Sequence, residues 1–365
     1  MAFTPSYAFK KIQKKMNIVH ITWGFNPGGI ETMLIDIANE QIKTEDVTII
    51  VVNDMVNQTM VECLNSKVKI FCCGRKQGSK NPLPILRMNY YLYITRPNVI
   101  HYHGDGLTKY TFFKAVKVLT IHNVHSVCPE YGKYDKLFAI SKAVKDYVKE
   151  KGFQSLVIEN GIRVNGIIQR KKWTIDNGCR IVQVGRLYHQ HKGQNLMVEA
   201  MNVLVNLKKY KNVHVDFIGD GSSYELLKKM VDDHCLNDFV SFLGSRDRNY
   251  IYSHLKDYDL CIQPSISEGF GLTVAEAMAA KVPVIVSDVP GTMEVIDNGQ
   301  YGLFFESGNA VDLACKIERF LLEDGMDAGK IEAAWNYVYN NFDISNTVKK
   351  YLEEYKKLLS SETIH

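Results

Sequence analysis

The sequence predicts an α/β fold with two Rossmann-like, doubly wound domains that face each other across a cleft. The chain has 365 residues, which is more than one hydrophobic core usually supports. Short apolar, β-rich segments alternate with helical patterns along most of this length, as in parallel sheets covered by helices. The strand-like segments fall into two series, so we expect two such sheets.

The first series contains seven predicted strands, each a short run rich in Val, Ile, Leu or aromatic residues. They lie at residues 17–23, 46–52, 68–73, 98–104, 117–123, 136–140 and 155–159. We expect residues 16–165 to form the first domain. A basic extension at 1–15 precedes it, with four lysines beside aromatic residues, and fits a membrane-surface helix, an upstream start or a floppy tail.

The second series contains six predicted strands and follows a stretch without strand pattern at about 163–178. They lie at residues 180–184, 213–218, 240–243, 260–263, 282–286 and 302–305. We expect residues 166–327 to form the second domain. Two further helical patterns, at 330–340 and 345–359, are too long for the last helix of a sheet, so residues 328–365 are expected to pack back across both domains.

Composition and charge restrict the class of protein. The eight cysteines form no CxxC pair, no apolar run reaches the roughly 18 residues that span a bilayer, and no signal peptide is recognisable. We therefore expect a cytoplasmic protein. Residues 1–165 carry 22 Lys and Arg against 13 Asp and Glu, net +9, and the remainder carries 22 against 27, net −5. The basic half predicts an anionic partner such as the inner membrane face, although a basic surface without a partner fits equally well.

The first predicted strand is followed by Gly28 and Gly29, directly before a helix that should begin near Ile30. Glycines at this position let the backbone approach a ligand, and the free N–H groups of a helix start favour a phosphate. A tight βα turn without a ligand gives the same pattern.

Two cations follow the first strand of the second series. Arg186 would leave the strand end, and Lys192 would lie in the first turn of the next helix, where the helix dipole disfavours a cation. A bound diphosphate would compensate both charges and would make Mg²⁺ unnecessary, so neither a metal nor another cofactor is expected. The alternative is a pair of exposed surface cations.

Two carboxylates with seven residues between them lie between the strands at 260–263 and 282–286. Glu268 is placed in a loop and Glu276 on a helix that begins near Leu272. Glu276 can accept two hydrogen bonds from a ribose diol, and Glu268 can accept them from sugar hydroxyls beside the amides of residues 269–271. A capping carboxylate and an ordinary helical glutamate remain the alternative.

Together these motifs resemble those of the family 4 retaining glycosyltransferases, glycosyl transferases group 1, which have the GT-B fold. The pattern Glu, seven residues, Glu is that family's signature. The match covers about residues 16–345, and further segments agree in order: 28–29, 101–103, 120–123, 138–141, 158–162, 185–187, 192–193 and 219–221. Members usually begin at the first strand, so residues 1–15 are additional.

The resemblance implies roles for individual residues. Catalytic roles fall to Arg186, Lys192, Glu268 and His122, of which the two cations hold the donor diphosphate and His122 contacts the sugar. Donor binding falls to Gly28, Gly29, Arg246, Gly269, Phe270, Gly271, Leu272, Thr273 and Glu276. The first domain would bind the acceptor.

The implied activity is metal-independent, hexosyltransferase-type transfer from a UDP- or GDP-sugar to a glycan or lipid-linked acceptor, in cell-surface polysaccharide or glycolipid biosynthesis. No nucleic acid partner is expected. A nucleotide-sugar epimerase remains an alternative, and it would need an acid/base pair among His101, His103 and Asp105. An inactive sugar-binding subunit is another. A zinc cluster of His122, His125 and Cys128 with His101 and His103 is a weaker one.

Overall fold

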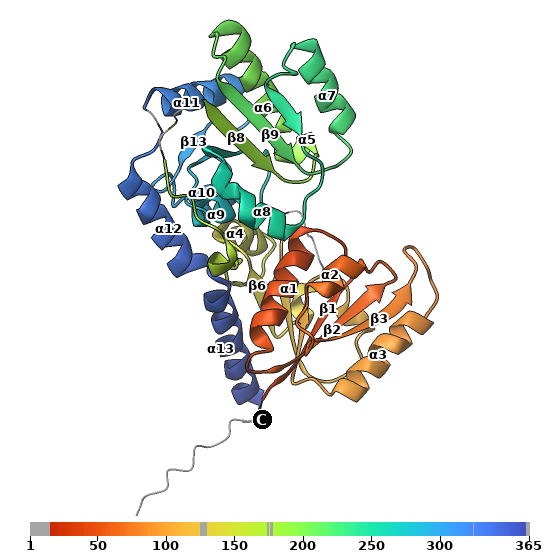
Figure 1. Ribbon diagram of the computed structural model, residues 1–365. Coiled ribbons are helices and arrows are strands. Elements are labelled where there is room, and N and C mark those ends of the chain that lie inside the picture. The colour runs from red at the N-terminus through yellow and green to blue at the C-terminus, as the bar shows by residue number, and fades with distance from the viewer. Residues whose placement is uncertain (1–14, 125–129, 174, 176–177, 324, 363–365) are drawn as a thin grey trace, which may run out of the picture.

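The computed structural model describes residues 15–124, 130–173, 175, 178–323 and 325–362, and these form two lobes, each a parallel sheet flanked by helices (Figure 1). The expected extension at 1–15 therefore lies almost wholly outside the described residues. No described helix is both long enough and apolar enough to cross a bilayer.

The first lobe contains a seven-stranded sheet in the order β3-β2-β1-β4-β5-β6-β7. All its pairings are parallel. The central strands are almost wholly buried because they are apolar on both faces, whereas the edge strands β3 and β7 are partly exposed. The bounds are β1 (Asn17–Thr22), β2 (Asp46–Asn53), β3 (Lys69–Arg75), β4 (Val99–Tyr102), β5 (Val116–Ile121), β6 (Lys136–Ala139) and β7 (Leu156–Val157). Each predicted strand of the first series is found.

The second lobe repeats this topology with six parallel strands in the order β10-β9-β8-β11-β12-β13. The bounds are β8 (Cys179–Val184), β9 (Val213–Ile218), β10 (Val240–Phe242), β11 (Leu260–Gln263), β12 (Val284–Ser287) and β13 (Leu303–Phe305). The predicted fold class is thereby confirmed. In both sheets the strand order reverses beside the first strand, at β1/β4 and at β8/β11, where doubly wound folds bind ligands.

Helices cover both faces of each sheet. In the first lobe they are α1 (Gly29–Gln41), α2 (Gln58–Glu62), α3 (Leu83–Thr95) and α4 (Lys142–Glu150). In the second they are α5 (His189–Lys192), α6 (Gln194–Asn202), α7 (Tyr224–Asp233), α8 (Arg248–His254), α9 (Leu272–Ala279), α10 (Pro290–Val295) and α11 (Ala310–Leu322). Short 3-10 turns occupy Thr108–Tyr110, Tyr131–Lys133, Val164–Gly166 and Leu255–Asp257, and a π-helical turn occupies Val203–Leu207.

The C-terminal helices contact different lobes. Helix α12 (Ala328–Phe342) packs against α9 of the second lobe, whereas α13 (Ile344–Glu362) packs against α1 and β5 of the first (Figure 1). Tyr351 and Tyr355 of α13 are buried in a cluster with Ile18 and Phe138 of the first sheet. The chain thus returns to its first lobe after completing the second.

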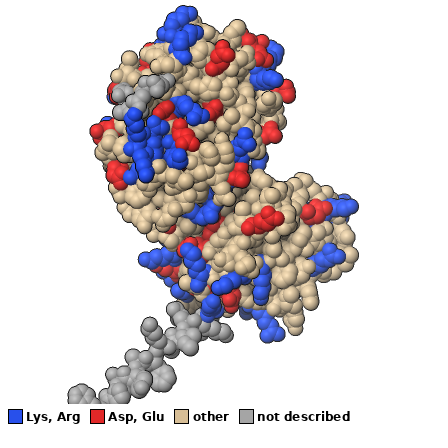
Figure 2. All heavy atoms as spheres, viewed as in Figure 1, with Lys and Arg blue, Asp and Glu red and all other residues tan. Residues whose placement is uncertain are grey.

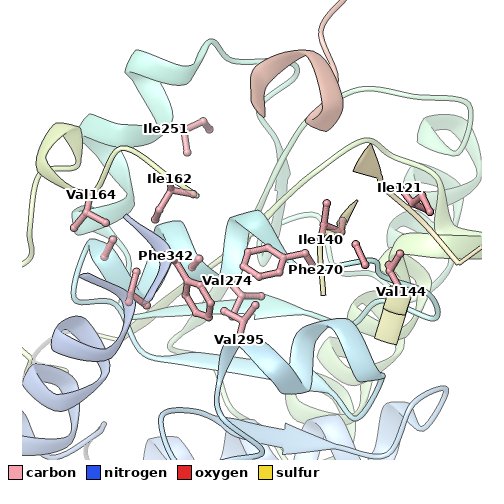
Figure 3. Close-up of a cluster of buried hydrophobic side chains, with 14 of the residues drawn as sticks. Ile121, Ile140, Val144, Ile162, Val164, Ile251, Phe270, Val274, Val295 and Phe342 are labelled. Carbon is pink, nitrogen blue, oxygen red and sulfur yellow. The ribbon is translucent and has the colours of Figure 1, made fainter. Parts of the chain in front are cut away.

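A continuous hydrophobic core connects the lobes. Figure 3 shows Ile140 of the first lobe near Phe270 of the second, with Phe342 at the end of α12 beside them. The rings of Phe270 and Phe342 meet edge to face at 5.1 Å between centroids. Glu294 of α10 adds a polar contact, since its carboxylate accepts hydrogen bonds from the first two N–H groups of α4, at 2.8 and 2.7 Å.

Candidate active site

A cavity of about 520 Å³ lies between the lobes and is lined by residues from both. Its walls come from the segments that follow β1, β5, β8 and β11, so it occupies the carboxyl edge of both sheets. Most residues predicted from the sequence lie on this wall: Gly28, Gly29, His122, Arg186, Lys192, Glu268, Gly269, Phe270, Gly271, Leu272 and Thr273. Folding therefore brings together residues that are up to 245 positions apart, from 28 to 273.

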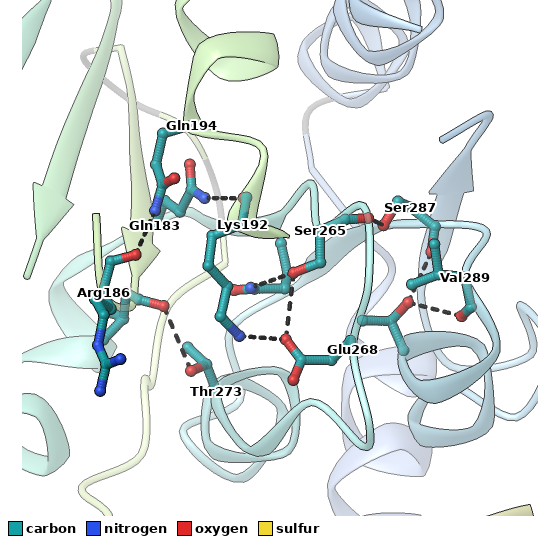
Figure 4. A network of polar contacts seen from close by, with 12 residues as sticks. Gln183, Arg186, Lys192, Gln194, Ser265, Glu268, Thr273, Ser287 and Val289 are labelled. Atoms are coloured by element: carbon teal, nitrogen blue, oxygen red, sulfur yellow. Dashed lines mark hydrogen bonds and ion pairs between the residues drawn. The ribbon is translucent and has the colours of Figure 1, made fainter. Parts of the chain in front are cut away.

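Two buried glutamines hold the loop that carries Arg186 and Lys192. The side-chain amide of Gln183 donates to the carbonyl of Lys192 at 2.9 Å, and that of Gln194 donates to the carbonyl of Arg186 at 2.9 Å (Figure 4). Both glutamines are almost fully buried. Because buried amides are costly to leave without a partner, these bonds fix the backbone from which both cations extend.

We expected Lys192 in the first turn of a helix that continues beyond it, and the structure differs. Lys192 instead ends the single turn α5, and Gly193 separates α5 from α6 with φ of +63°. A Cβ at Gly193 would lie 1.8 Å from the carbonyl oxygen of Pro264, so only glycine fits there. The break turns Lys192 towards the cavity at the C-terminal end of α5, where a cation is not disfavoured.

Lys192 and Glu268 form an ion pair on the cavity wall. The Lys192 ammonium donates to Glu268 Oε2 at 2.5 Å, and the hydroxyl of Ser265 donates to the same oxygen at 3.3 Å. Ser265 in turn accepts a hydrogen bond from the side chain of Gln263 at 2.8 Å. No described carboxylate forms an ion pair with Arg186 (Figure 4).

The first lobe approaches the second closely at His122. A Cβ added to Gly269 would lie 2.8 Å from the carbonyl oxygen of His122, so the absence of a side chain at 269 permits this contact. Gly28 and Gly29 face the same cavity at the start of α1. Helix α1 has 13 residues, and its first N–H groups are a site where an anion is favoured.

His122, which is partly exposed to the cavity, lies at the end of a chain of histidines whose other members, His103 and His20, are buried. His122 Nε2 is 3.3 Å from His103 Nδ1, His103 Nε2 is 2.9 Å from His20 Nδ1, and His20 Nε2 is 2.7 Å from the Gln41 side-chain oxygen. Burial lowers the pKa of His122 to about 4 and that of His20 to about 4, and it holds the pKa of His103 well below its usual range. These imidazoles are therefore neutral at physiological pH, and each ring can both donate and accept.

The alternatives built on histidines lose support from this arrangement. The ring nitrogens of His101 contact Thr120 Oγ1 and the Tyr355 hydroxyl, both at 2.7 Å, so His101 is no acid or base of the cleft as an epimerase would need. His125 and Cys128 of the suggested zinc cluster lie outside the described residues. Among described residues, nitrogens of His20, His101 and His103 lie within 4.8 Å of one another, but hydrogen bonds within the protein already engage these rings.

Glu276 lies behind the cavity wall in a cluster of buried charges. Its Oε1 is 3.8 Å from Arg248 Nη2, and Arg248 Nη1 is 2.6 Å from Oδ2 of Asp36, whose side chain has no exposed surface. Arg163 contacts the other Asp36 oxygen at 3.2 Å. Asp36 belongs to α1 and Arg248 to α8, so this cluster joins the lobes. Burial raises the pKa of Glu276 to about 7, and the charge of Arg248 partly offsets that effect.

Arg246 also lies off the cavity wall and is not one of the described residues that line it. Its guanidinium is 5.2 Å from the centroid of the Tyr250 ring, a cation–π distance, whereas the adjacent Ser245 does line the cavity. The structure therefore brings eleven of the thirteen predicted residues to one surface and leaves Arg246 and Glu276 beside it.

Sequence reasoning assigned no role to several other residues on the wall, among them Asn160, Tyr188, His191 and Gln263. Asn160 lies in the matched segment 158–162, which was a usable signal. Glu31 was also missed, and it lines an adjoining cavity of about 200 Å³ with Trp23, His103 and Asp105. Burial raises the pKa of Glu31, while a bond from its own backbone N–H and the charge of Arg186 oppose this.

A family model described as Glycosyl transferases group 1 matches residues 167–336. The second lobe thus contains a glycosyl transferases group 1 domain, as the sequence resemblance implies. The chain spans about half to two thirds of the length of the curated relatives it matches. One of them, the O-antigen biosynthesis glycosyltransferase WclY of Escherichia coli, is 28% identical over 228 residues, which cover 57% of this chain and 62% of that protein.

Solved structures agree over nearly the whole chain. A glycosyltransferase from Rickettsia africae ESF-5 is 25% identical with a TM-score of 0.79, and the match covers 95% of this chain and 99% of that one. Anabaena HepE, solved in complex with UDP-glucose, is 21% identical with a TM-score of 0.76, and the match covers 95% and 100%. The fold is therefore the GT-B arrangement of two Rossmann-like lobes.

Proposed function

We propose that this protein is a metal-independent, retaining glycosyltransferase that moves a hexose from a UDP- or GDP-sugar to a glycan or lipid-linked acceptor. The observation that carries the proposal is the placement of Arg186 and Lys192, held by Gln183 and Gln194, beside a cavity lined by both lobes. The group 1 domain supports it, as do the O-antigen role of WclY and the UDP-glucose complex of HepE. The reaction would be a step in the biosynthesis of a cell-surface polysaccharide or glycolipid, carried out at the cytoplasmic face of the membrane.

In this proposal the donor diphosphate binds between Arg186, Lys192 and the start of α1. Two cations and a helix N-terminus stabilise the charge that grows on the diphosphate as it departs. Glu268 and the amides of 269–271 bind the hydroxyls of the sugar, and the neutral imidazole of His122 contacts it from the first lobe. Glu276, which lies behind the wall, would bind the ribose, and the charge of Arg248 limits the rise of its pKa.

Transfer then proceeds on one face of the sugar. The bond between the anomeric carbon and the diphosphate oxygen loosens first, and the acceptor hydroxyl oxygen forms the new bond from the same side. Its proton passes to an oxygen of the departing diphosphate. No protein base is required, which agrees with the lowered pKa values of His103 and His122, since an imidazole with a low pKa is a weak base.

Nucleotide release measured with and without acceptor tests the proposed reaction. A first screen for thermal stabilisation by UDP- and GDP-sugars identifies the donor, because a ligand at about 100 times its Kd stabilises a protein by about 2.7 kcal/mol. A transferase releases nucleotide in step with acceptor consumption. Stoichiometric conversion of the donor to an epimer, with acceptor absent, would contradict the proposal.

Activity is expected to be unchanged by EDTA, because Arg186 and Lys192 take the place of a metal at the diphosphate. The measurement is the initial rate after exhaustive chelation, compared with the rate after adding Mg²⁺ or Mn²⁺ back. A rate that falls on chelation and returns with either ion would assign the diphosphate to a metal instead.

The new glycosidic bond is expected to keep the anomeric configuration of the donor. Inversion would need a base on the acceptor side, and double displacement would need a nucleophile under the anomeric carbon. Proton NMR of the product from an α-linked donor reports the configuration through the anomeric coupling constant. A β product would overturn this mechanism and would make Asp105 and Glu31, which line the adjoining cavity, the candidate bases.

A further inference from the structure

Helix α3 presents large apolar side chains to solvent as well as to the core. Its buried side carries Pro84, Met88 and Leu92, which pack on the first sheet. Five further side chains are between 48% and 63% exposed, at spacings of three to four residues that place them along one side of the helix: Leu83, Leu86, Tyr90, Tyr93 and Ile94. A helix that is apolar on both sides is normally covered on both sides.

The loop before β5 extends this surface. Asn89 of α3 donates to the carbonyl of Tyr110 and accepts from the N–H of Phe112, both at 2.8 Å. These bonds hold Phe112, which is 72% exposed, next to α3. Together with Phe112, the five exposed side chains of α3 form one apolar strip: Leu83, Leu86, Tyr90, Tyr93, Ile94 and Phe112. Exposed apolar patches of this kind mark sites of contact with membranes or proteins.

The chain segment that contains the apolar strip is strongly basic. Between residues 67 and 117 Asp105 is the single acidic residue, against ten cations: Lys67, Lys69, Arg75, Lys76, Lys80, Arg87, Arg96, Lys109, Lys114 and Lys117. None of these ten forms an ion pair with a described carboxylate. In Figure 2 the lobe that carries α3, at lower right, shows broad uncharged surface with Lys and Arg near its edges and a few Asp and Glu along its upper side.

We propose that the apolar strip and its basic surroundings dock this protein on an anionic lipid bilayer. Cations without an ion pair to any described carboxylate favour an anionic partner, and each Lys or Arg near such a surface contributes about a fivefold gain in binding. Tyrosine and phenylalanine are suited to the interface between lipid headgroups and acyl chains, where an apolar ring and a polar hydroxyl are both accommodated. Helix α3 would lie in the plane of the bilayer surface.

The docking surface lies close to the acceptor side of the cleft. Asp105 and Gly104 line the cavity of about 200 Å³, and the same loop continues over seven residues to Phe112 in the apolar strip. A bilayer against this strip would bring membrane lipids near that cavity. Docking does not depend on the proposed transfer reaction, since it requires neither donor nor acceptor.

Flotation of the full-length protein with vesicles tests the proposal without any enzymatic readout. Binding is expected to vesicles containing phosphatidylglycerol, to fall at least tenfold on phosphatidylcholine alone, and to fall as salt rises from about 0.1 M to 1 M. The variant Leu86→Ser/Tyr90→Ser/Tyr93→Ser is expected to lose binding at least tenfold, and Lys76→Glu/Lys80→Glu/Lys114→Glu at least as much. The six side chains replaced in these two variants are all exposed, so both variants should fold, which circular dichroism would verify.

Matched controls replace equally exposed groups of the second lobe. Leu207→Ser/Leu322→Ser and Lys228→Glu/Lys330→Glu are expected to bind vesicles like the unaltered protein. Removal of residues 1–15 is expected to leave part of the binding, with the remainder still sensitive to the α3 variants. Equal binding to neutral and anionic vesicles would overturn the proposal. So would a concentration-dependent dimer that only the α3 variants abolish, with no vesicle binding, which would make a second copy the occupant.

Discussion

Alanine at Arg186 or at Lys192 is expected to lower kcat by a factor of about 100 or more while the protein stays folded. Both cations face the cavity from a loop whose backbone is held by Gln183 and Gln194, so removing a side chain leaves the loop in place. The loss should appear in kcat, because the charge they stabilise is greatest when the diphosphate departs. Steady-state rates and unfolding curves for both variants provide the measurement.

The two variants differ in their local effect, which supplies a control. Lys192→Ala also leaves Glu268 without its ion pair, whereas Arg186→Ala breaks no ion pair among the described residues. Combining Lys192→Ala with Glu268→Gln separates the loss of the cation from the effect of a carboxylate left alone. Lys228→Ala, an exposed lysine on α7, should keep full activity. Wild-type rates for both Arg186→Ala and Lys192→Ala would remove the assignment of the diphosphate site.

Replacing Arg248 by methionine is expected to lower the free energy of unfolding by about 3 to 5 kcal/mol at pH 8, because it leaves buried carboxylates without their main cation. Asp36 is fully buried, and Arg248 contacts it at 2.6 Å and Glu276 at 3.8 Å. Chemical denaturation at several pH values is the measurement. Arg163→Met is the matched control, since Arg163 contacts Asp36 at 3.2 Å but is 44% exposed, and it should cost far less.

The pH dependence gives this prediction a second readout. Burial raises the pKa of Asp36 and brings that of Glu276 to about 7. A carboxyl whose pKa is raised by folding binds more protons in the folded state than in the unfolded state. The free energy of unfolding therefore falls as the pH rises from about 4.5, the pKa of a glutamate in the unfolded chain, towards 7. Without Arg248 both pKa values rise further. The variant should therefore be closer to the parent protein at pH 6 than at pH 8. A difference below 1 kcal/mol at pH 8 would contradict the inferred cluster.

Local sequence patterns predicted the fold because parallel strands buried on both faces are short apolar runs, and all thirteen such runs became strands. The same holds for most cavity residues. Gly28, Arg186 and Glu268 lie in the segments that follow predicted strands. In a parallel sheet the carboxyl ends of the strands lie at the same edge, so these residues come together there. The helix at Lys192 was predicted incorrectly. The pattern at 191–193 indicates the start of one helix, but Gly193 takes a left-handed conformation and separates α5 from α6.

Contacts between distant segments could not be predicted in this way. Asp36 and Arg248 are 212 positions apart, and neither residue carries a local signal, because a charged residue on an amphipathic helix normally faces solvent. The histidine chain is similar: His20, His103 and His122 follow three different strands or lie within them, and only the sheet order makes them neighbours. The position of Glu276 also depends on this packing. From the sequence we expected Glu276 on the cavity wall, whereas the structure places it behind the wall, beside Arg248.

The return of α13 to the first lobe has a consequence for the order in which the protein matures. The end of β7 and the start of α13 are separated by 186 residues, yet Tyr351 and Tyr355 fill the first core and contact Thr120 and His101. At about 5 to 20 residues per second, the ribosome needs roughly 10 to 40 s to make that interval. During this time the nascent first lobe lacks one wall, and His101 lacks its tyrosine partner. Completion of the first lobe thus waits for synthesis of the second.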